Sequence, residues 1–270
     1  MRKILSTTFF RGWAVGAALS VSVGATQAAV INGGFETAAF PPWTFTGGAG
    51  VASGAFGTPP AGGLHHALME TGPSVQSSMT TIETFLGVPG GSITAFHPNP
   101  PGHPLVEGSA IRQTGVSIGA GQSVTFDFNF LTDEATGAGG VSDTAFWTLS
   151  STPFTGVFFL ADPNTSAFAV TSFTRFSDET GYASVNSGPL PAGTYTIGFG
   201  VADYAVTTVD SGLLIDNVAA IPEPATSSLV LTLAGITLLH RRRCQIDPQF
   251  FPKIAKKAKD FHYFRWVLDL

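Results

Sequence analysis

The sequence predicts an all-β protein built as a jelly-roll sandwich, in which two antiparallel sheets pack face to face. Glycine and proline supply 32 and 18 of the 270 residues, while charged residues make up only 11%, well below the ~25% of an average soluble domain. This composition provides many turns and few helix formers. Roughly ten short strand-like segments follow one another between these turns, and such a succession is typical of sandwiches.

The two clearest strands are 124–130 and 195–201. In the first, four apolar residues alternate with three polar ones, which is the period of a strand with one buried face. In the second, the apolar residues alternate with threonine, Gly198 and Gly200, directly after a turn at 190–193. We expect the polar and glycine faces of both strands to be in contact with water.

Weaker patterns predict nine further strands and one helix. The strands are expected at 30–35, 43–45, 64–70, 111–118, 144–149, 154–160, 171–176, 181–185 and 213–218. Thr80 and Glu83 have the spacing of a capping box, and Gly87 provides a stop, so a helix of one to two turns is expected at 80–86. The proline-rich segment 97–104 is expected to be a surface loop.

Residues 1–28 have the layout of a secretory signal peptide: basic residues at the start, an apolar run, and small residues at the end. We expect recognition by the Sec translocon and cleavage after Ala28. An N-terminal membrane anchor is the alternative, although the apolar run is shorter than the ~20 residues that span a bilayer.

The charge of the body disfavours nucleic acid as a partner. Between Ala29 and Pro224 there are two arginines, no lysine and fifteen acidic residues, a formal charge of −13 that would repel a phosphate backbone. The same segment has no cysteine, because Cys244 is the only one in the chain. Disulfides, thiol nucleophiles and cysteine metal sites are therefore excluded there.

The C-terminal region contains Pro222, Glu223 and Pro224, then fifteen uncharged and mostly apolar residues, and finally Arg241, Arg242 and Arg243. These three elements resemble the PEP-CTERM sorting tail of Gram-negative bacteria, which the exosortase protease recognises. The resemblance implies that 221–243 is a sorting signal, which inserts transiently into the membrane and is removed. A stable membrane anchor is the alternative, since an arginine cluster also holds a helix in place.

Residues 244–270 continue past the point where such tails usually stop. They form a basic segment rich in aromatic residues that could lie on an anionic membrane surface. The alternative is an added segment with no role. In either case it could impair recognition by the sorting protease.

The body, 29–220, also carries a resemblance. The run 32–36 with Trp43 is similar to the first strand of many PEP-CTERM ectodomains and of several jelly-roll carbohydrate-binding families. The segment 130–134, followed by Asp143 and Phe146, resembles a central motif of the PEP-CTERM group, and 210–218 resembles its last strand.

That resemblance implies a cofactor. Acidic residues at the positions of Glu36 and Asp216 hold a structural calcium ion in the carbohydrate-binding jelly rolls, where the first and last strands are neighbours. Oxygen ligands suit calcium and are the only ones this cysteine-free body offers in quantity. The alternative is that Glu36 caps a turn and Asp216 is a solvated strand end.

Other candidate sites have competing interpretations. Asp133, Glu134 and Asp143 could form a second ion site, a solvated loop, or the acid pair of a glycosidase. Because adjacent residues on a strand point to opposite faces, Asp133 and Glu134 do not form such a pair by themselves. Four histidines could supply a zinc site only if they converged, which the sequence does not show. A sugar could stack on four aromatic residues, although core packing is favoured for the two tryptophans among them. These residues are His65, His66, His97 and His103, and Trp43, Trp147, Tyr182 and Tyr204.

Taken together, these patterns predict an exported, non-enzymatic protein of a Gram-negative cell envelope, outer surface or extracellular matrix. The family resemblance associates it with exopolysaccharide and biofilm, as a structural or glycan-binding component. No catalytic residue is assigned, because the sequence has no nucleophile elbow and no phosphate loop. A secreted glycan hydrolase is the alternative from another class, and the glycan itself is not determined.

Overall fold

The computed structural model describes residues 30–72, 76–96, 104–137, 140–168, 170–204 and 209–222. Contacts divide the chain into two units, Met1–Ile221 and Pro222–Leu270. The predicted signal peptide and the sorting tail beyond Pro222 lie outside the described residues, as does the 244–270 extension. Among the described residues, no helix is long and apolar enough to cross a membrane.

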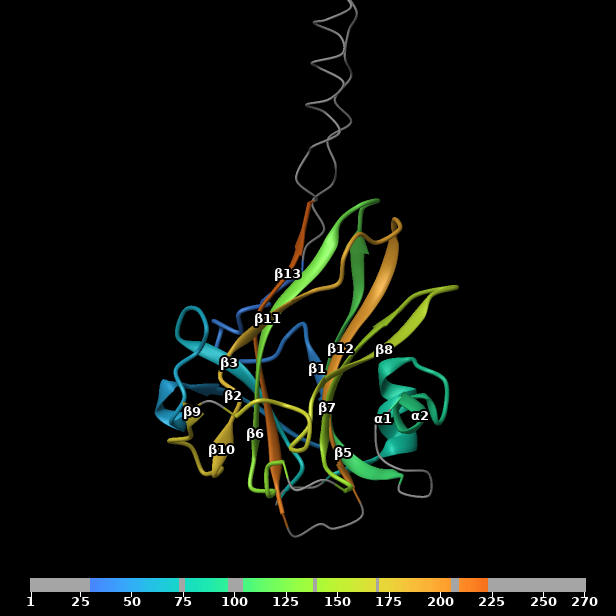
Figure 1. Ribbon diagram of the computed structural model, residues 1–270. Coiled ribbons are helices and arrows are strands. Elements are labelled where there is room, and N and C mark those ends of the chain that lie inside the picture. The colour runs from blue at the N-terminus through green and yellow to red at the C-terminus, as the bar shows by residue number, and fades with distance from the viewer. Residues whose placement is uncertain are drawn as a thin grey trace, which may run out of the picture. The chain divides into compact units, whose positions relative to one another are not determined.

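Two antiparallel sheets form the described part of the chain (Figure 1). Sheet A contains β1 (Thr44–Thr46), β4 (Ser77–Ser78), β5 (Leu105–Ile118), β7 (Thr144–Ser150), β8 (Thr155–Ala161) and β12 (Gly193–Tyr204). Sheet B contains β2 (Gly48–Ser53), β3 (His65–Glu70), β6 (Ser123–Thr132), β9 (Val170–Thr171), β10 (Asp178–Glu179), β11 (Ala183–Asn186) and β13 (Ser211–Ile221).

The strand order is that of a jelly roll, as the sequence predicts. Its eight main strands are, along the chain, β3, β5, β6, β7, β8, β11, β12 and β13. Sheet B pairs them as β3-β13-β6-β11 and sheet A as β5-β12-β7-β8. Counted one to eight, these orders are 1-8-3-6 and 2-7-4-5, the pattern produced by two Greek keys.

The main core lies between the sheets. The apolar side chains of β6 and β12 that alternate along the sequence all point into it, so the inward faces of both strands are as predicted. Phe126, Phe130 and Phe199 are at most 1% exposed. Trp43 and Trp147 also belong to this core, where Trp147 stacks on Phe158 with ring centroids 4.4 Å apart.

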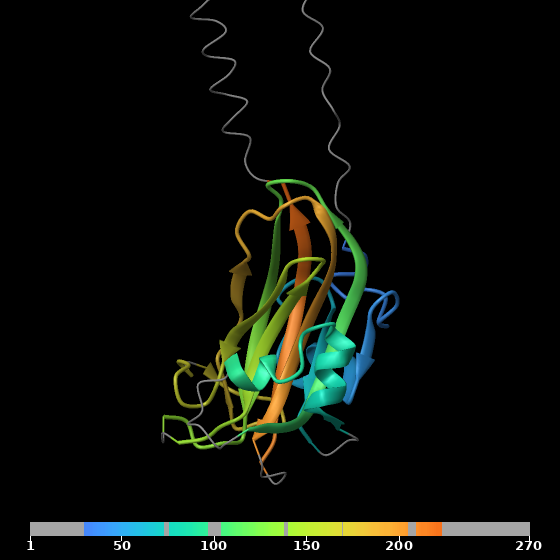
Figure 2. The same cartoon turned by 90° about the vertical axis from the view of Figure 1, so that its right-hand side faces the viewer.

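Two helices cover the outer face of sheet A (Figures 1 and 2). These are α1 (Met79–Leu86) and α2 (Ser92–Phe96). Ile82, Leu86 and Ile93 pack with Phe146 and Ala202 of the sheet in a second hydrophobic core. The prediction that the glycine face of β12 is wet is therefore wrong: Gly198 and Gly200 are buried, because the absence of a side chain makes room for Leu86 and the Phe146 ring.

Helix α1 is present where the sequence predicts a helix, but its cap differs. The N-cap is Ser78, whose side chain accepts a hydrogen bond from the Thr81 amide, and not Thr80. Glu83 is buried, and its carboxylate accepts hydrogen bonds from the amides of Gly91 and Ile93 at 2.7 and 3.0 Å. It thus holds the start of α2 against α1 instead of closing a capping box.

Two strand predictions also need correction, and strand β2 was not predicted. Residues 30–35 form turns, because Asn32 and Phe35 have positive φ angles that regular strand geometry excludes. Strand structure near 171–176 is limited to β9 and the adjacent β10, separated by a loop. Strand β2 lies at 48–53, in a segment of glycine and other small residues that shows no alternation of apolar and polar side chains.

All three hydrophobic clusters of the described residues are complete within 30–221. The third lies on the outer face of sheet B and contains Leu131, Phe176 and Leu214. The unit therefore carries its own core, and we refer to residues 29–222 as the body segment.

Candidate functional site

Glu36 and Asp216 approach each other, as the resemblance implies. A Cβ atom placed on Gly34 would lie 3.7 Å from both Asp216 Oδ1 and Glu36 Cγ. Glu36 accepts hydrogen bonds from the amides of Leu64 and His65, and Asp216 accepts one from Gly62 at 2.9 Å. The two carboxylates therefore bind the same loop, 62–65, and tie the first segment of the body to its last strand.

The backbone around this corner is unusual. The non-glycine residues with positive φ among those described are Asn32, Phe35, Ala38 and Asn217, and all four flank Glu36 or Asp216. Each such conformation costs of order 1 kcal/mol, and such residues cluster where a functional geometry is held in place. Local strain therefore marks this corner independently of the acidic residues.

The two carboxyl groups have different electrostatics. Asp216 is fully buried, and burial raises its pKa, opposed by hydrogen bonds from the Gly62 and Asn217 amides and reinforced by the charges of Glu36 and Asp127. Glu36 is exposed, and the Leu64 and His65 amides lower its pKa. The two carboxylates are chemically suited to a calcium ion, because they supply hard oxygen ligands. A bound ion would also reduce the electrostatic repulsion between Glu36 and Asp216.

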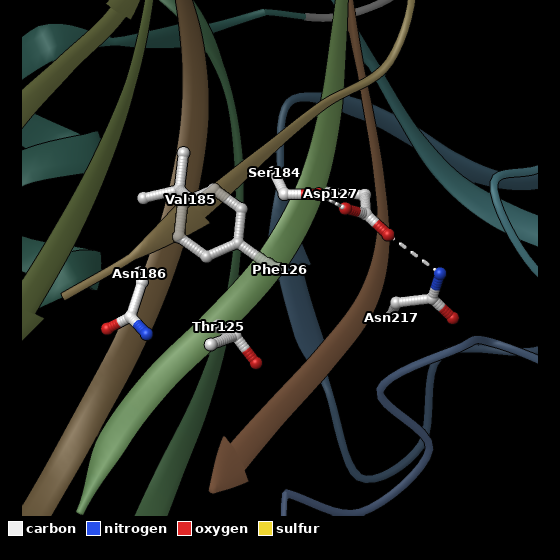
Figure 3. Close-up of a pocket in the computed structure, with 7 residues that line it drawn as sticks. All are labelled: Thr125, Phe126, Asp127, Ser184, Val185, Asn186 and Asn217. Carbon is white, nitrogen blue, oxygen red and sulfur yellow. Dashed lines mark hydrogen bonds between the residues drawn. The ribbon is translucent and has the colours of Figure 1, made fainter. Parts of the chain in front are cut away.

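A polar pocket lies beside this corner on the outer face of sheet B (Figure 3). Its volume is about 360 Å³. We call it the polar pocket; its lining residues come from β6, β11 and β13 and are Thr125, Phe126, Asp127, Ser184, Val185, Asn186 and Asn217. Asp127 lies between two neighbours: the Ser184 hydroxyl donates to Oδ1, and the Asn217 side-chain amide donates to Oδ2 at 2.8 Å.

The sheet register explains why these side chains meet. Thr125 pairs with Asn186 and Asp127 with Ser184, so all four side chains share one face of the β6–β11 ladder. On the other side of β6, the register shifts between Asp216 and Ala219, and Asn217 has φ +52° at this bulge. The bulge directs the Asn217 side chain toward Asp127 (Figure 3).

The predicted acidic group Asp133, Glu134 and Asp143 separates into two parts. Asp133 binds the amide and hydroxyl of Ser177, away from the others. Glu134 accepts a hydrogen bond from the Asp143 amide at 3.0 Å, so these two do lie together. Asp143 is fully buried and accepts a hydrogen bond from the Tyr204 amide. Asp203, which sequence reasoning missed, joins Asp143 at this end of the sandwich.

Burial and mutual charge raise the pKa values of this group. The pKa of Asp143 is well above its ordinary value because of burial and then the Glu134 and Asp203 charges. Burial raises the pKa of Asp203 to about 6. The negative charge of Glu107 adds to this increase, and a side-chain hydrogen bond with Asp143 opposes it. Glu134 also has a raised pKa, mainly through burial.

Of the histidine and aromatic candidates, His66, Tyr182 and Tyr204 have structural contacts among the described residues. His66 is buried, and its Nδ1 lies 2.7 Å from the Tyr182 hydroxyl, which argues against a zinc ligand and against an open stacking surface at Tyr182. Tyr204 packs against the second core. His97 and His103 lie outside the described residues. Within the described ranges, no three His, Cys, Asp or Glu side chains are placed to hold a metal ion.

Comparison with known proteins gives similarity in strand arrangement only. A carbohydrate-binding module, TmCBM61 in complex with β-1,4-galactotriose, has 13% identity and a TM-score of 0.40 over 73% of this chain and 100% of its own. The K1 cleaved adhesin domain of Lys-gingipain from Porphyromonas gingivalis W83 has 13% identity and a TM-score of 0.38 over 71% and 96%. The xylan-binding CBM22-1 domain of Paenibacillus barcinonensis Xyn10C has 11% identity and a TM-score of 0.30 over 71% and 93%.

No family model matches the sequence, and no curated protein matches it. The fold assignment therefore rests on the sheet topology itself. The predicted sorting motif also stays a prediction, since all of it except Pro222 lies outside the described residues.

Proposed function

We propose that this protein is an exported, non-enzymatic component of a Gram-negative cell envelope or extracellular matrix, and that it binds polysaccharide at the polar pocket. The observation that carries the proposal is the pocket itself. It offers hydroxyl, carboxamide and carboxylate groups on a rigid sheet face, and ligand sites of this kind fix orientation with a few convergent polar groups.

The pocket lies on the accessible sheet. Helices α1 and α2 cover the outer face of sheet A, so a ligand cannot lie along its central strands. On sheet B, the third cluster covers one half, while Ser184, Asn186 and Asn217 are exposed on the other. A glycan bound here would contact these exposed side chains first.

The charges of the body disfavour an anionic glycan as the ligand. The body has only two arginines, and both are engaged: Arg112 donates to the Phe85 carbonyl, and Arg175 pairs with Glu70 and Asp210. Asp127 adds a negative charge inside the pocket. Uronic-acid and sulfated polymers would be repelled, so the ligand is a neutral or amino-sugar polysaccharide.

The pocket has no means of hydrolysing a sugar. Hydrolysis uses two carboxyl groups on opposite sides of the glycosidic bond, and Asp127 is the only acidic residue that lines the pocket. The buried pair of Asp143 and Asp203 belongs to a different place in the fold. We therefore favour binding over the alternative of a secreted glycan hydrolase.

The route of export is proposed from sequence segments on either side of the body. Export through the Sec translocon, transient membrane insertion and removal of the tail by exosortase are proposed from the signal-like segment 1–28 and from the Pro222, Glu223, Pro224 and Arg241–Arg243 elements. A calcium ion at Glu36 and Asp216 is proposed as a structural cofactor that fixes the corner next to the pocket.

A glycan array with the purified body segment tests this function. Binding to neutral or amino-sugar polymers, without release of reducing ends from any of them, is the expected result. Release of reducing sugars that Asp143→Asn or Glu134→Gln abolishes would establish the hydrolase instead. No binding to any polymer would refute the proposed glycan-binding role.

A further inference from the structure

Three acidic residues lie together at one end of sheet A: Glu107 in β5, Asp203 in β12, and Asp143 directly before β7. In the β12–β5 ladder, Asp203 pairs with Glu107. In the β12–β7 ladder, Ala202 pairs with Thr144, so the next position places Asp203 opposite Asp143. Opposed side chains in such a ladder have Cβ atoms ~5 Å apart, which brings the Asp143 and Asp203 carboxyl groups together.

These side chains face the space between the sheets. Val201 and Ala145, each two residues away along its strand, belong to the main core, and side chains two apart share a face. On the side of sheet B, Thr71 directly follows β3, and its hydroxyl donates a hydrogen bond to Asp143 Oδ2 at 3.2 Å. Glu134 is also close, because its carboxylate accepts a hydrogen bond from the Asp143 backbone amide.

Among the described residues, only Asp143 can share a hydrogen bond with the Asp203 side chain, and this needs a proton on one of the two carboxyl groups. Asp203 is 1% exposed, and when both groups are ionised neither of its carboxylate oxygens accepts a hydrogen bond from a described donor. Asp143 differs, because Thr71 and the Tyr204 amide donate to its two oxygens. A buried carboxylate without a hydrogen-bond donor or a counter-charge is costly, so such a group points to a ligand that completes it.

The described basic residues do not supply the counter-charge. Arg112 lies over the Phe85 ring, with its Cζ 4.4 Å from the centroid, and donates to the Phe85 carbonyl. Arg175 binds Glu70, Asp210 and the Gly72 carbonyl. The segment from Ala29 to Pro224 has no lysine.

We propose that Asp203 and Asp143 bind a calcium ion between the sheets, at the end of the sandwich formed by β5, β7 and β12. Two carboxylates and the Thr71 hydroxyl supply hard oxygen donors, and backbone carbonyls or water complete the six to eight ligands that calcium takes. Nitrogen and sulfur donors are absent from this group, which disfavours zinc and copper. The site is separate from Glu36 and Asp216 and does not depend on glycan binding.

Calcium bound per molecule of the body segment is the direct test, measured by equilibrium dialysis with calcium as the only added divalent ion. Asp203→Asn is the variant of choice, because no described residue other than Asp143 hydrogen-bonds to the Asp203 side chain. It should bind one calcium ion fewer than the wild type. Asp178→Asn, the same change at a half-buried acid of β10, should bind as many as the wild type.

Thermal unfolding in EDTA separates ion binding from a purely structural role. Without calcium, Asp203→Asn should melt at the same temperature as the wild type or higher, because the substitution removes a like charge from a buried pair. A lower melting temperature in EDTA would show a structural role and overturn the proposal. Equal calcium binding by the wild type and Asp203→Asn, or no binding by the wild type, would also overturn it.

Discussion

Gly198 is the position at which the packing of α1 on sheet A can be tested by one added carbon atom. A Cβ atom there would lie 2.6 Å from Thr148 Oγ1 and closer still to Leu86 Cδ2. Real Cβ contacts are longer, so Gly198→Ala forces Leu86 to shift and pushes α1 away from the sheet. Overpacking of this kind typically costs about 1–3 kcal/mol.

Gly50→Ala is the matched control. Gly50 also lies in a strand, β2, but an added Cβ would meet nothing within 4 Å. Replacing a strand glycine without strain stabilises by about 0.4–1 kcal/mol through the unfolded chain. The two variants should therefore differ by about 1.5–4 kcal/mol, or at least ~3 °C in melting temperature for a domain of this size.

Thermal unfolding of the body segment measures this difference. In a Leu86→Ala background the part of the cost that comes from the Leu86 methyl group should disappear, whereas the part that comes from Thr148 Oγ1 should remain. If Gly198→Ala is as stable as Gly50→Ala in the wild-type background, α1 does not rest on Gly198. The outer face of sheet A would then be open to ligands, contrary to the argument for sheet B.

Three other predictions concern the corner, a buried histidine and the tail. Calcium at 100 times its dissociation constant should stabilise the body segment by about 2.7 kcal/mol, and Glu36→Gln should abolish the corner's share of the rise in melting temperature; an unchanged response would remove the corner site. Burial lowers the pKa of His66 to about 4, so the unfolded chain binds its proton first, and wild-type stability should fall relative to His66→Gln as the pH drops from about 6.5 to 4. Parallel pH profiles from chemical unfolding would contradict this. Mass spectrometry of the mature protein from a host with exosortase should find a C-terminus near 222–225, whereas an intact 244–270 segment would indicate a retained anchor or failed sorting.

The strand faces that form the core could be predicted from the sequence. Which outer sheet faces are covered by helices could not be predicted. Alternation in β6 and β12 decides which side chains point inward, because the period of a strand is local. Whether the other face meets water depends on a segment far away in the chain. Glycine at 198 and 200 was compatible with a wet face and with a close helix contact, and only the position of α1 decides between them.

The candidate sites divide in the same way. Glu36 and Asp216 were found through a resemblance, and their approach follows from the pairing of β13 with β3 next to the 62–65 loop. Asp203 was missed because it is sixty residues from Asp143 in the sequence and meets it only through the β7–β12 register. The polar pocket left a weak signal, the polar residues at alternate positions of β6 and β11, but the register that joins them is a property of the folded sheet.

Binding of a neutral or amino-sugar oligosaccharide to the body segment, measured by isothermal titration calorimetry with pocket variants, tests the proposed function most directly. Asp127→Ala and Asn186→Ala should each weaken binding at least tenfold, about 1.4 kcal/mol, because each removes polar groups from the pocket. Thr114→Ala, at an exposed position of β5 on the other sheet, should bind as the wild type does. Equal affinity in all four proteins would contradict glycan binding at the polar pocket.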